Sequence, residues 1–318
     1  MKNDMLMAKA DEPGWINLAI GEPGCLQDTF SLYGFYEPRN DVPAQAYPPL
    51  GGTPALLQEL RELHPDHHIV VAAGAKQALL AAIHSCKPAQ DSVPAIVHRK
   101  PYWPSHKTLA ELSGCLFEAS EYATALDIRI NTSPNNPDGS LDPQQCDIWD
   151  AAYAHSLYGF DVRDTPPHKV AVYSAAKILG VSGDRVGWLI TKDREIAAAA
   201  ASYIESTTSG VSIYSQQRVA DVLWRVRTHP KQAAEAYRGV RGRLAENALS
   251  LEDALDGPVM NARGMFAWFR LSSQIRTRFQ EAKVRFLPGE ACGVKGFARV
   301  NLGASDYLFD AAIERLRR

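Results

Sequence analysis

Cysteine is scarce in this sequence, and no two cysteines lie close together along the chain. The five cysteines are an odd number without a CxxC spacing, which disfavours both a disulfide framework and a zinc cage: Cys25, Cys86, Cys115, Cys146 and Cys292. The histidines of HPDHH (64–68) come without matching carboxylates or cysteines, so a solvated turn is expected there and no metal site. The pattern favours a reduced, cytoplasmic setting.

An excess of positive charge and a long apolar run are also missing. The chain has 34 Lys and Arg against 36 Asp and Glu, a formal net charge of -2, which gives no basic surface for nucleic acid. The longest apolar stretch, Ile69 to Ile83, is too short to span a bilayer and contains Lys76. The N-terminal residues lack the apolar core of a signal peptide. Neither nucleic acid nor membrane is an expected partner.

Strand-like and helical patterns alternate through the first half of the chain. TPALLQELREL predicts a helix with a threonine cap, HIVVAAG predicts a buried strand ending at glycine, and AKQALLAAIHSC predicts the next helix. With 46% hydrophobic residues in 318, the chain can bury a large core. We therefore predict an α/β fold whose large domain has a mostly parallel sheet with helices on both faces and a binding crevice at the carboxyl ends of the strands.

The pattern changes after about residue 235. A long charged helix is followed by short strands (MFAWFRL, VRFLPG, FARVNLG) and a closing helix. This predicts a small α+β domain of residues 1–44 and 236–318 beside a large domain of residues 45–235.

Chemically distinctive residues follow the predicted strands. Gly74, Ala75 and Lys76 open a helix after a strand, where free N–H groups favour a phosphate, although an ordinary turn looks the same. Two asparagines framed by prolines lie in NTSPNNPDG (131–139), which could also be a surface turn. Asp150 follows an apolar run and is either a helix cap or a catalytic carboxylate. Lys177 lies in a small, mostly apolar segment eight residues before Arg185.

The order of these pieces is more specific than any one of them. Glycine turn, Asn-Pro loop, Asp-x-x-Tyr and Ser-x-x-Lys followed by Gly-x-Arg resembles the fold-type I pyridoxal-phosphate-dependent aminotransferases of class I/II. SPNNPDG, SAAKILGVSGDRVGWLITKD and YIESTTSGVSIYSQQR are most similar to the branch that contains plant alliinases and tryptophan aminotransferases. The resemblance extends from INLAIGEPG to ARVNLGASD.

This resemblance implies pyridoxal 5′-phosphate as cofactor and a role for each motif residue. Lys177 would form a Schiff base with the cofactor aldehyde and then move the substrate's α-proton. A lysine in an apolar pocket beside a cation has a lowered pKa and is nucleophilic near neutral pH. Asp150 would pair with the pyridinium nitrogen, and Tyr153 and Asn136 would hydrogen-bond the phenolic oxygen.

Phosphate and ring contacts follow from the same resemblance. Ser174 and Arg185 would bind the phosphate, Arg185 through its planar guanidinium, and the backbone of residues 74–76 would add donors. Trp103 would stack on the cofactor ring, although a core position is the alternative. The turn departs from the family because Ala75 and Lys76 stand where a serine or threonine is usual.

The substrate and the partner subunit are also implied. Arg299 would bind the α-carboxylate of an amino acid, with Gly21 and Asn136 close to the same group. Tyr47 would reach the cofactor phosphate of a neighbouring subunit, so a homodimer with shared active sites is expected. The short segment between Gly139 and Asp150 predicts that a crossover helix is shortened or lost.

Three functions are compatible with this set. The first is an aminotransferase exchanging an amino group between an L-amino acid and a 2-oxo acid. The second is a C–S lyase that eliminates a β-substituent, as alliinases do, and the third is a cofactor-binding protein without turnover. The intact Lys177, Asp150, Arg185 and Arg299 disfavour the third. Transamination is ranked first because the epidermal-growth-factor-like segment of plant alliinases is absent. The aromatics Trp15, Tyr33, Phe35 and Tyr36 suggest a bulky or aromatic substrate.

Overall fold

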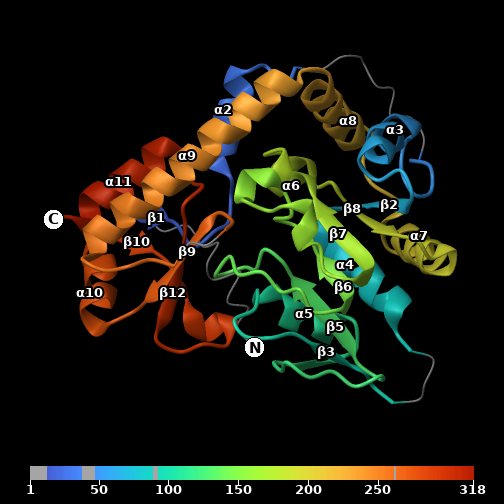
Figure 1. The fold of residues 1–318 in the computed structure, drawn as a ribbon, viewed down its shortest axis with the longest axis horizontal. Coiled ribbons are helices and arrows are strands. Elements are labelled where there is room, and N and C mark those ends of the chain that lie inside the picture. Colours follow the sequence, from blue (N-terminus) through green and yellow to red (C-terminus); the bar gives the residue numbers. More distant parts are fainter. Residues whose placement is uncertain (1–12, 38–46, 89–91, 261–262) are drawn as a thin grey trace.

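The computed structural model describes residues 13–37, 47–88, 92–260 and 263–318. Within these residues the largest sheet has the strand order β2-β8-β7-β6-β5-β3-β4 (Figure 1). β8 is antiparallel to both of its neighbours, and every other neighbouring pair is parallel, which confirms the predicted mostly parallel sheet. The strands are β2 (His68–Ala72), β3 (Ala95–Val97), β4 (Leu116–Glu118), β5 (Ile128–Thr132), β6 (Cys146–Asp150), β7 (His168–Ser174) and β8 (Gly187–Thr191).

Alternate residues of β2 and β7 face two separate cores. Val70 and Val172 pack into one core together with residues of α4 (Ala75–Cys86) and α7 (Arg194–Thr208). Val71 and Ala171 pack into the other, which includes residues of α3 (Pro54–Leu63) and α8 (Ile213–Thr228). Side chains of a strand alternate between its faces, so consecutive apolar residues need a helical layer on each side. The prediction of helices on both faces is confirmed.

Local signals explain where the helices next to the site begin. Thr53 caps α3 by accepting a hydrogen bond from the Leu56 N–H, and Pro54 stands in the first turn, where no N–H partner is needed. Gly74 precedes α4 with φ +80°, a backbone conformation that residues with a side chain rarely adopt. The sharp turn places the first N–H groups of α4 at the end of β2.

The connection between β5 and β6 is short. Residues 133–145, all of them described, contain no helix, although β5 and β6 are parallel. The expected loss of the crossover helix is therefore confirmed. The short path brings the end of β5 directly beside the end of β6, with Thr132 opposite Asp150 in register.

The C-terminal part has its own small sheets. In the described residues β11 (Leu287–Pro288), β12 (Phe297–Asn301) and β9 (Phe266–Arg270) form an antiparallel sheet, and β1 (Ile16–Asn17) pairs in parallel with β10 (Val284–Arg285). The helices of this part are α2 (Gly24–Leu32), α9 (Pro230–Leu255), α10 (Ser273–Glu281) and α11 (Asp306–Leu316).

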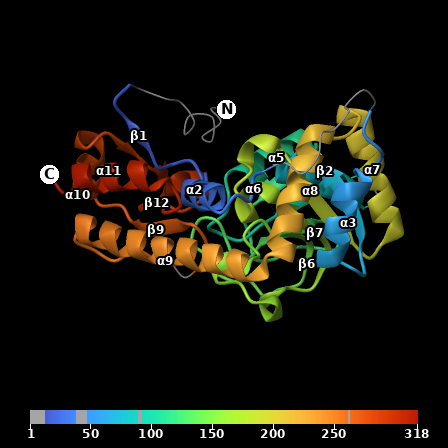
Figure 2. The same cartoon turned by 90° about the horizontal axis from the view of Figure 1, so that it is seen from above.

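Helix α9 runs from the neighbourhood of α8 to that of α10 and α11 (Figures 1 and 2). The predicted domain boundary at 235/236 therefore falls within this helix, and the one at 44/45 lies outside the described residues. Helix α10 was not predicted, although Ser272 caps it by accepting from the Ile275 N–H. None of the helices in the described ranges combines the length and apolarity needed to cross a membrane.

Candidate active site

The ends of the central strands bring the predicted residues together. Asp150 ends β6, Ser174 ends β7, and Lys177 lies in the short helix α6 (Ala175–Ile178) that follows. Gly187 of β8 is the register partner of both Ala72 and Ser174. A Cβ at Gly187 would lie 2.5 Å from the Ala75 nitrogen, so only glycine allows the turn before α4 to approach β8 this closely.

Lys177 is half-buried and donates a hydrogen bond from Nζ to the Gly21 carbonyl. Burial, followed by the positive charge of Arg299, lowers the pKa of Lys177 to about 8; Glu22 opposes this shift, while Arg185 and Lys76 add to it. At pH 7 about a tenth of the amine is thus uncharged, the form that attacks carbonyl carbon. The sequence-based expectation of a lowered pKa agrees with this environment.

Asp150 is buried, and each of its carboxylate oxygens has a partner. Oδ1 accepts from the Ala152 N–H at 3.2 Å, and Oδ2 lies 3.3 Å from Nε2 of His106. His106 is itself fully buried, and within the described residues its Nδ1 has no hydrogen-bond partner. The ring of His98 stacks on it with centroids 4.8 Å apart, and burial lowers the pKa of His98 well below its usual value.

The two histidines were not predicted as part of the site. His106 follows Trp103 by three residues on the chain, and α5 (Ser105–Leu112) begins between them. The indole of Trp103 meets the His106 ring edge-on, at 5.3 Å between centroids. In the sequence, the signal for these contacts was a tryptophan and a histidine three residues apart after β3. This pair can be assigned to the site only once the fold places Asp150 beside it.

A second polar chain joins Tyr153, Asn136 and Arg299. Asn136 donates to the Tyr153 hydroxyl at 3.4 Å and accepts from Nη1 of Arg299 at 2.6 Å. Arg299 also donates from Nη2 to the Ala19 carbonyl at 2.6 Å, and its guanidinium lies 4.1 Å above the Phe266 ring. Only 1% of Arg299 is exposed, and its Nε has no partner among the described residues. Neutral oxygens therefore hold Arg299 in place, and its guanidinium keeps N–H groups that can donate to a further acceptor.

Positive groups surround the start of α4. Arg185 has a left-handed backbone (φ 51°), and its guanidinium lies against Gly74: a Cβ there would be 2.5 Å from Nη2. The Lys76 ammonium lies 5.3 Å from the centroid of Trp103. A guanidinium next to a helix N-terminus is an unfavourable pairing of like charges, which an anion between them relieves. This grouping of positive charge suits an anion, and the phosphate role expected from the sequence stays a prediction.

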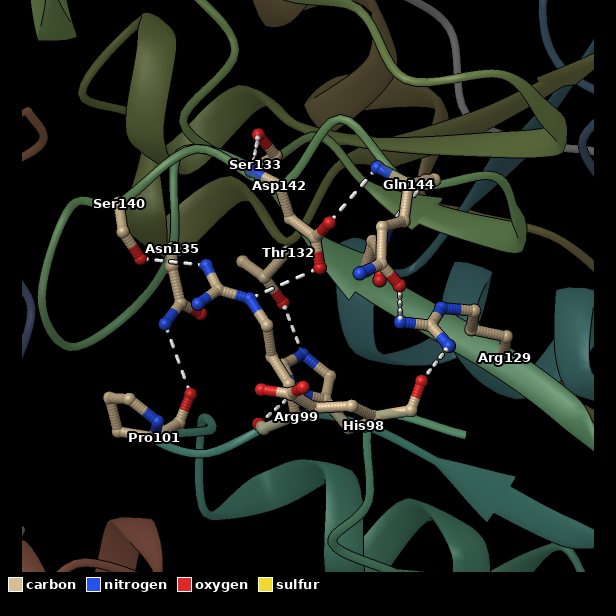
Figure 3. Close-up of polar contacts among 12 residues, drawn as sticks. His98, Arg99, Pro101, Arg129, Thr132, Ser133, Asn135, Ser140, Asp142 and Gln144 are labelled. Carbon is tan, nitrogen blue, oxygen red and sulfur yellow. Dashed lines mark hydrogen bonds and ion pairs between the residues drawn. The ribbon is translucent and has the colours of Figure 1, made fainter. Parts of the chain in front are cut away.

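The short β5–β6 connection is fixed by a network of polar contacts (Figure 3). Arg99 forms an ion pair with buried Asp142 at 3.1 Å and donates to the Ser140 hydroxyl at 2.7 Å. Asn135 donates to the Pro101 carbonyl at 3.0 Å. These contacts tie the loop to the segment after β3 and thus hold Asn136, the next residue, at the site.

Comparison with known proteins agrees with this arrangement. The family model described as allinase matches residues 62–241, more than half of the chain. The chain belongs to the alliinase family. Its fold is that of fold-type I enzymes: the aspartate aminotransferase of Thermus thermophilus with maleate superposes with a TM-score of 0.74 at 20% identity, covering 96% of this chain and 91% of that one.

Two curated relatives are similar over about half of the chain. Tryptophan aminotransferase-related protein 2 of Arabidopsis thaliana is 34% identical over 190 residues, 54% of this chain. Alliin lyase of Allium cepa var. aggregatum is 25% identical over 194 residues, 53% of this chain. The matched region spans 43% of the length of each relative.

Alliinase-family members use pyridoxal 5′-phosphate, and the residues of this chain fit that group. Lys177 offers an amine of lowered pKa, Asp150 a buried carboxylate at a strand end, and Arg185 with the start of α4 a cradle that a Cβ at Gly74 would fill. Ser174 is buried at the end of β7 and could add its hydroxyl. The individual roles of these residues stay predictions.

Other sequence-based interpretations fare differently in this alliinase-family chain. Tyr47 is 85% exposed, so its predicted role toward a second subunit stays a prediction. His64, expected in solvent, is half-buried: its Nε2 accepts from the Trp188 indole at 3.2 Å, and burial lowers the pKa of His64 to about 4. Its turn packs against the sheet because β2 begins only four residues later.

Three of the N-terminal aromatics have packing partners within their own chain. Phe35 is buried against Phe30 with ring centroids 4.6 Å apart, and the Tyr36 hydroxyl donates to the Leu179 carbonyl. Trp15 lies under the guanidinium of Arg285 at 5.5 Å. These contacts account for the three rings without a substrate, and a bulky or aromatic substrate stays a prediction.

Proposed function

We propose that this protein is a pyridoxal-phosphate-dependent aminotransferase that exchanges an amino group between an L-amino acid and a 2-oxo acid. The observation that supports it best is the pairing of Lys177 with Arg299. One is an amine of lowered pKa and the other a buried guanidinium with an unpartnered Nε, and the charge of Arg299 acts directly on Lys177. A base next to a carboxylate receptor is what chemistry at the α-carbon of an amino acid requires.

Arg299 would bind the substrate carboxylate and orient the substrate. Its Nη1 and Nη2 donate to the neutral oxygens of Asn136 and Ala19, which a carboxylate can replace or supplement with stronger, charge-assisted bonds. Binding the carboxylate at this end fixes the position of the α-carbon relative to Lys177. Fixed geometry of this kind replaces a random encounter and lowers the barrier.

Lys177 would then move the proton of the α-carbon. When bound, the cofactor supplies the carbonyl carbon that takes up the amino group and a ring that accepts the electron pair left by the proton. Asp150 would hold a proton on the ring nitrogen, and its position is fixed by the Ala152 N–H and by His106. Tyr153, whose pKa burial raises, would keep its proton and donate it as a hydrogen bond.

The family name gives a reason to keep β-elimination as the second candidate. Both reactions need the same base, carboxylate receptor and buried aspartate, and they diverge only after the proton has left the α-carbon. An amino acid without a leaving group on its β-carbon, such as phenylalanine, can react by transamination alone. A cysteine conjugate can react by either route.

A panel of amino acids distinguishes the candidates. We expect phenylalanine or another such amino acid to convert the bound cofactor to its amine form in one turnover, seen by absorbance, and a 2-oxo acid to reverse the change. Release of pyruvate from cysteine conjugates, with no amine form from any amino acid, would establish the lyase instead. Binding without either reaction would leave a cofactor-binding protein.

We also propose that the active unit is a homodimer. The exposed Tyr47 supports it, because a ring that is exposed on its own subunit could reach the site of a neighbour. Sedimentation of the wild type should give a dimer, and Tyr47→Phe should weaken cofactor binding without changing the sedimentation coefficient. A monomer with full activity would contradict this.

A further inference from the structure

Four consecutive backbone carbonyls, starting at Lys177 itself, accept hydrogen bonds from side chains. The Tyr158 hydroxyl donates to the Lys177 carbonyl at 2.6 Å. Tyr237 and Tyr36 donate to the carbonyls of Ile178 and Leu179, each at 2.9 Å. Gln27 completes the series by donating from Nε2 to the Gly180 carbonyl at 2.9 Å.

The donors come from separate parts of the chain. Gln27 lies in α2 and Tyr36 in the turn after it, Tyr158 ends the short 3-10 helix Ser156–Tyr158, and Tyr237 lies in α9. We name Gln27, Tyr36, Tyr158 and Tyr237 the carbonyl clamp. Distant segments thus converge on one stretch of four residues. Local helix formation does not require that the donors come from such distant segments.

Helix α6 explains why such donors are needed. It has only four residues, and a helix leaves its last carbonyls without partners from its own turns. The backbone hydrogen bond from the Leu179 N–H to the Ala175 carbonyl closes its single turn, so the direction in which the Lys177 side chain leaves the backbone depends on contacts from outside. Buried carbonyls are satisfied by side chains where the backbone offers no donor.

The clamp residues are themselves held in place. The Tyr158 ring packs edge-on against Tyr153 at 5.4 Å, and Tyr237 lies 5.4 Å from Phe30. Burial raises the pKa of each of the three tyrosines, so their hydroxyls stay protonated and available as donors. At Gly180 a Cβ would lie 2.5 Å from the Tyr36 hydroxyl oxygen, so the clamp also requires glycine there.

We propose that the carbonyl clamp consists of positioning residues that set the orientation of Lys177 for proton transfer at the substrate α-carbon. This inference rests on the proposed function, since it assigns Lys177 its role as base. The clamp acts through the backbone: none of the four side chains needs to touch substrate or cofactor. Losing the Tyr158 hydroxyl would free the carbonyl of Lys177 itself and should have the largest effect.

The test compares Tyr158→Phe, Tyr36→Phe and Thr191→Val with the wild type. Thr191 is the matched control: it is buried, and its hydroxyl also donates to a backbone carbonyl, that of Lys169, at 2.8 Å, but on β8, away from α6. Measured quantities are kcat, KM for the amino acid, the melting temperature and the pH at which the absorbance of the lysine-bound cofactor changes. Tyr36→Phe supplies the comparison should Tyr158→Phe fail to fold.

We expect Tyr158→Phe to lower kcat about tenfold, the scale of one buried hydrogen bond, with KM within about twofold and a shifted absorbance titration. Tyr36→Phe should do the same to a smaller extent, and Thr191→Val should lower only the melting temperature. Clamp variants that lose melting temperature as Thr191→Val does, with unchanged kcat and titration, would overturn the proposal. Failure of the proposed function would appear in the wild type as absent turnover, and the absorbance titration would still compare the variants.

Discussion

Lys177 lies between two walls that are built in different ways. On one side are the ends of β2, β6 and β7, where Gly74, Asp150 and Ser174 are fixed by neighbouring strands of one sheet. On the other side Arg299 of β12 meets Ala19 and Asn136 through single side-chain hydrogen bonds that join residues 280 and 163 positions apart. The first wall holds the predicted cofactor residues and the second the predicted substrate residues.

This difference has a functional meaning. A wall made by backbone ladders does not rearrange when a ligand arrives, which suits a cofactor that stays bound. Hydrogen bonds from a guanidinium to neutral oxygens can be exchanged for bonds to a carboxylate, which suits a substrate that comes and goes. Substitutions on the two sides should therefore separate effects on cofactor and chemistry from effects on substrate affinity.

The largest effect is expected at the residue between the walls. Lys177→Met should reduce turnover by about a thousandfold or more, because both the nucleophile and the base are lost. Borohydride reduction of the wild type followed by peptide mapping should place the cofactor on the peptide that contains Lys177. Lys76→Met serves as the control and should leave this label in place. A label on Lys76 would contradict the assignment.

On the cofactor side, Asp150→Ala should slow the first half-reaction by at least about two orders of magnitude, or about 3 kcal/mol, since a preorganised charge partner is removed. The KM for the amino acid should change little. Stopped-flow absorbance with a single turnover of substrate measures the rate. An unchanged rate in this variant would mean that the ring nitrogen is held by another group.

On the substrate side, Arg299→Ala should weaken amino-acid binding about ten- to a hundredfold, or about 1.5 to 3 kcal/mol, while cofactor affinity is kept. Arg299→Lys should recover only part of the loss, because a lysine lacks the planar pair of donors. Equal losses in cofactor and substrate affinity would show that the two walls are not independent, and so would break the comparison.

The smallest effect concerns stability without cofactor. Because folding lowers the pKa of Lys177 from 10.5 to about 8, the unfolded chain binds more protons between these values, and this group makes the folded protein more stable as pH rises from about 8 to about 10.5. Below pH 8 Lys177→Met should thus be more stable than wild type by about 1 to 2 kcal/mol. The difference should disappear near pH 10.5 in urea titrations.

The first wall could be predicted in large part from the sequence. Strands such as HIVVAAG are predicted from apolar runs that end at glycine, and parallel strands place their carboxyl ends along one edge of the sheet. Asp150, Ser174 and Lys177 each follow such a run, so their proximity follows from the strand pattern and the order of the motifs. The helix caps at Thr53 and Gly74 are local as well, since capping depends on residues within one turn.

The second wall and the carbonyl clamp depend on the tertiary structure. Tyr36, Tyr158 and Tyr237 have no common spacing, and a tyrosine in an isolated stretch predicts core packing as readily as a hydrogen bond to a distant carbonyl. His106 could be assigned to the site only from the fold, which places it beside Asp150, 44 positions away in the sequence. The sequence alone determined which strand ends would hold the chemistry, because period and turn signals act over a few residues. Only the folded chain decided which distant side chains orient Lys177 and Arg299, because those contacts depend on how helices and sheets pack against each other.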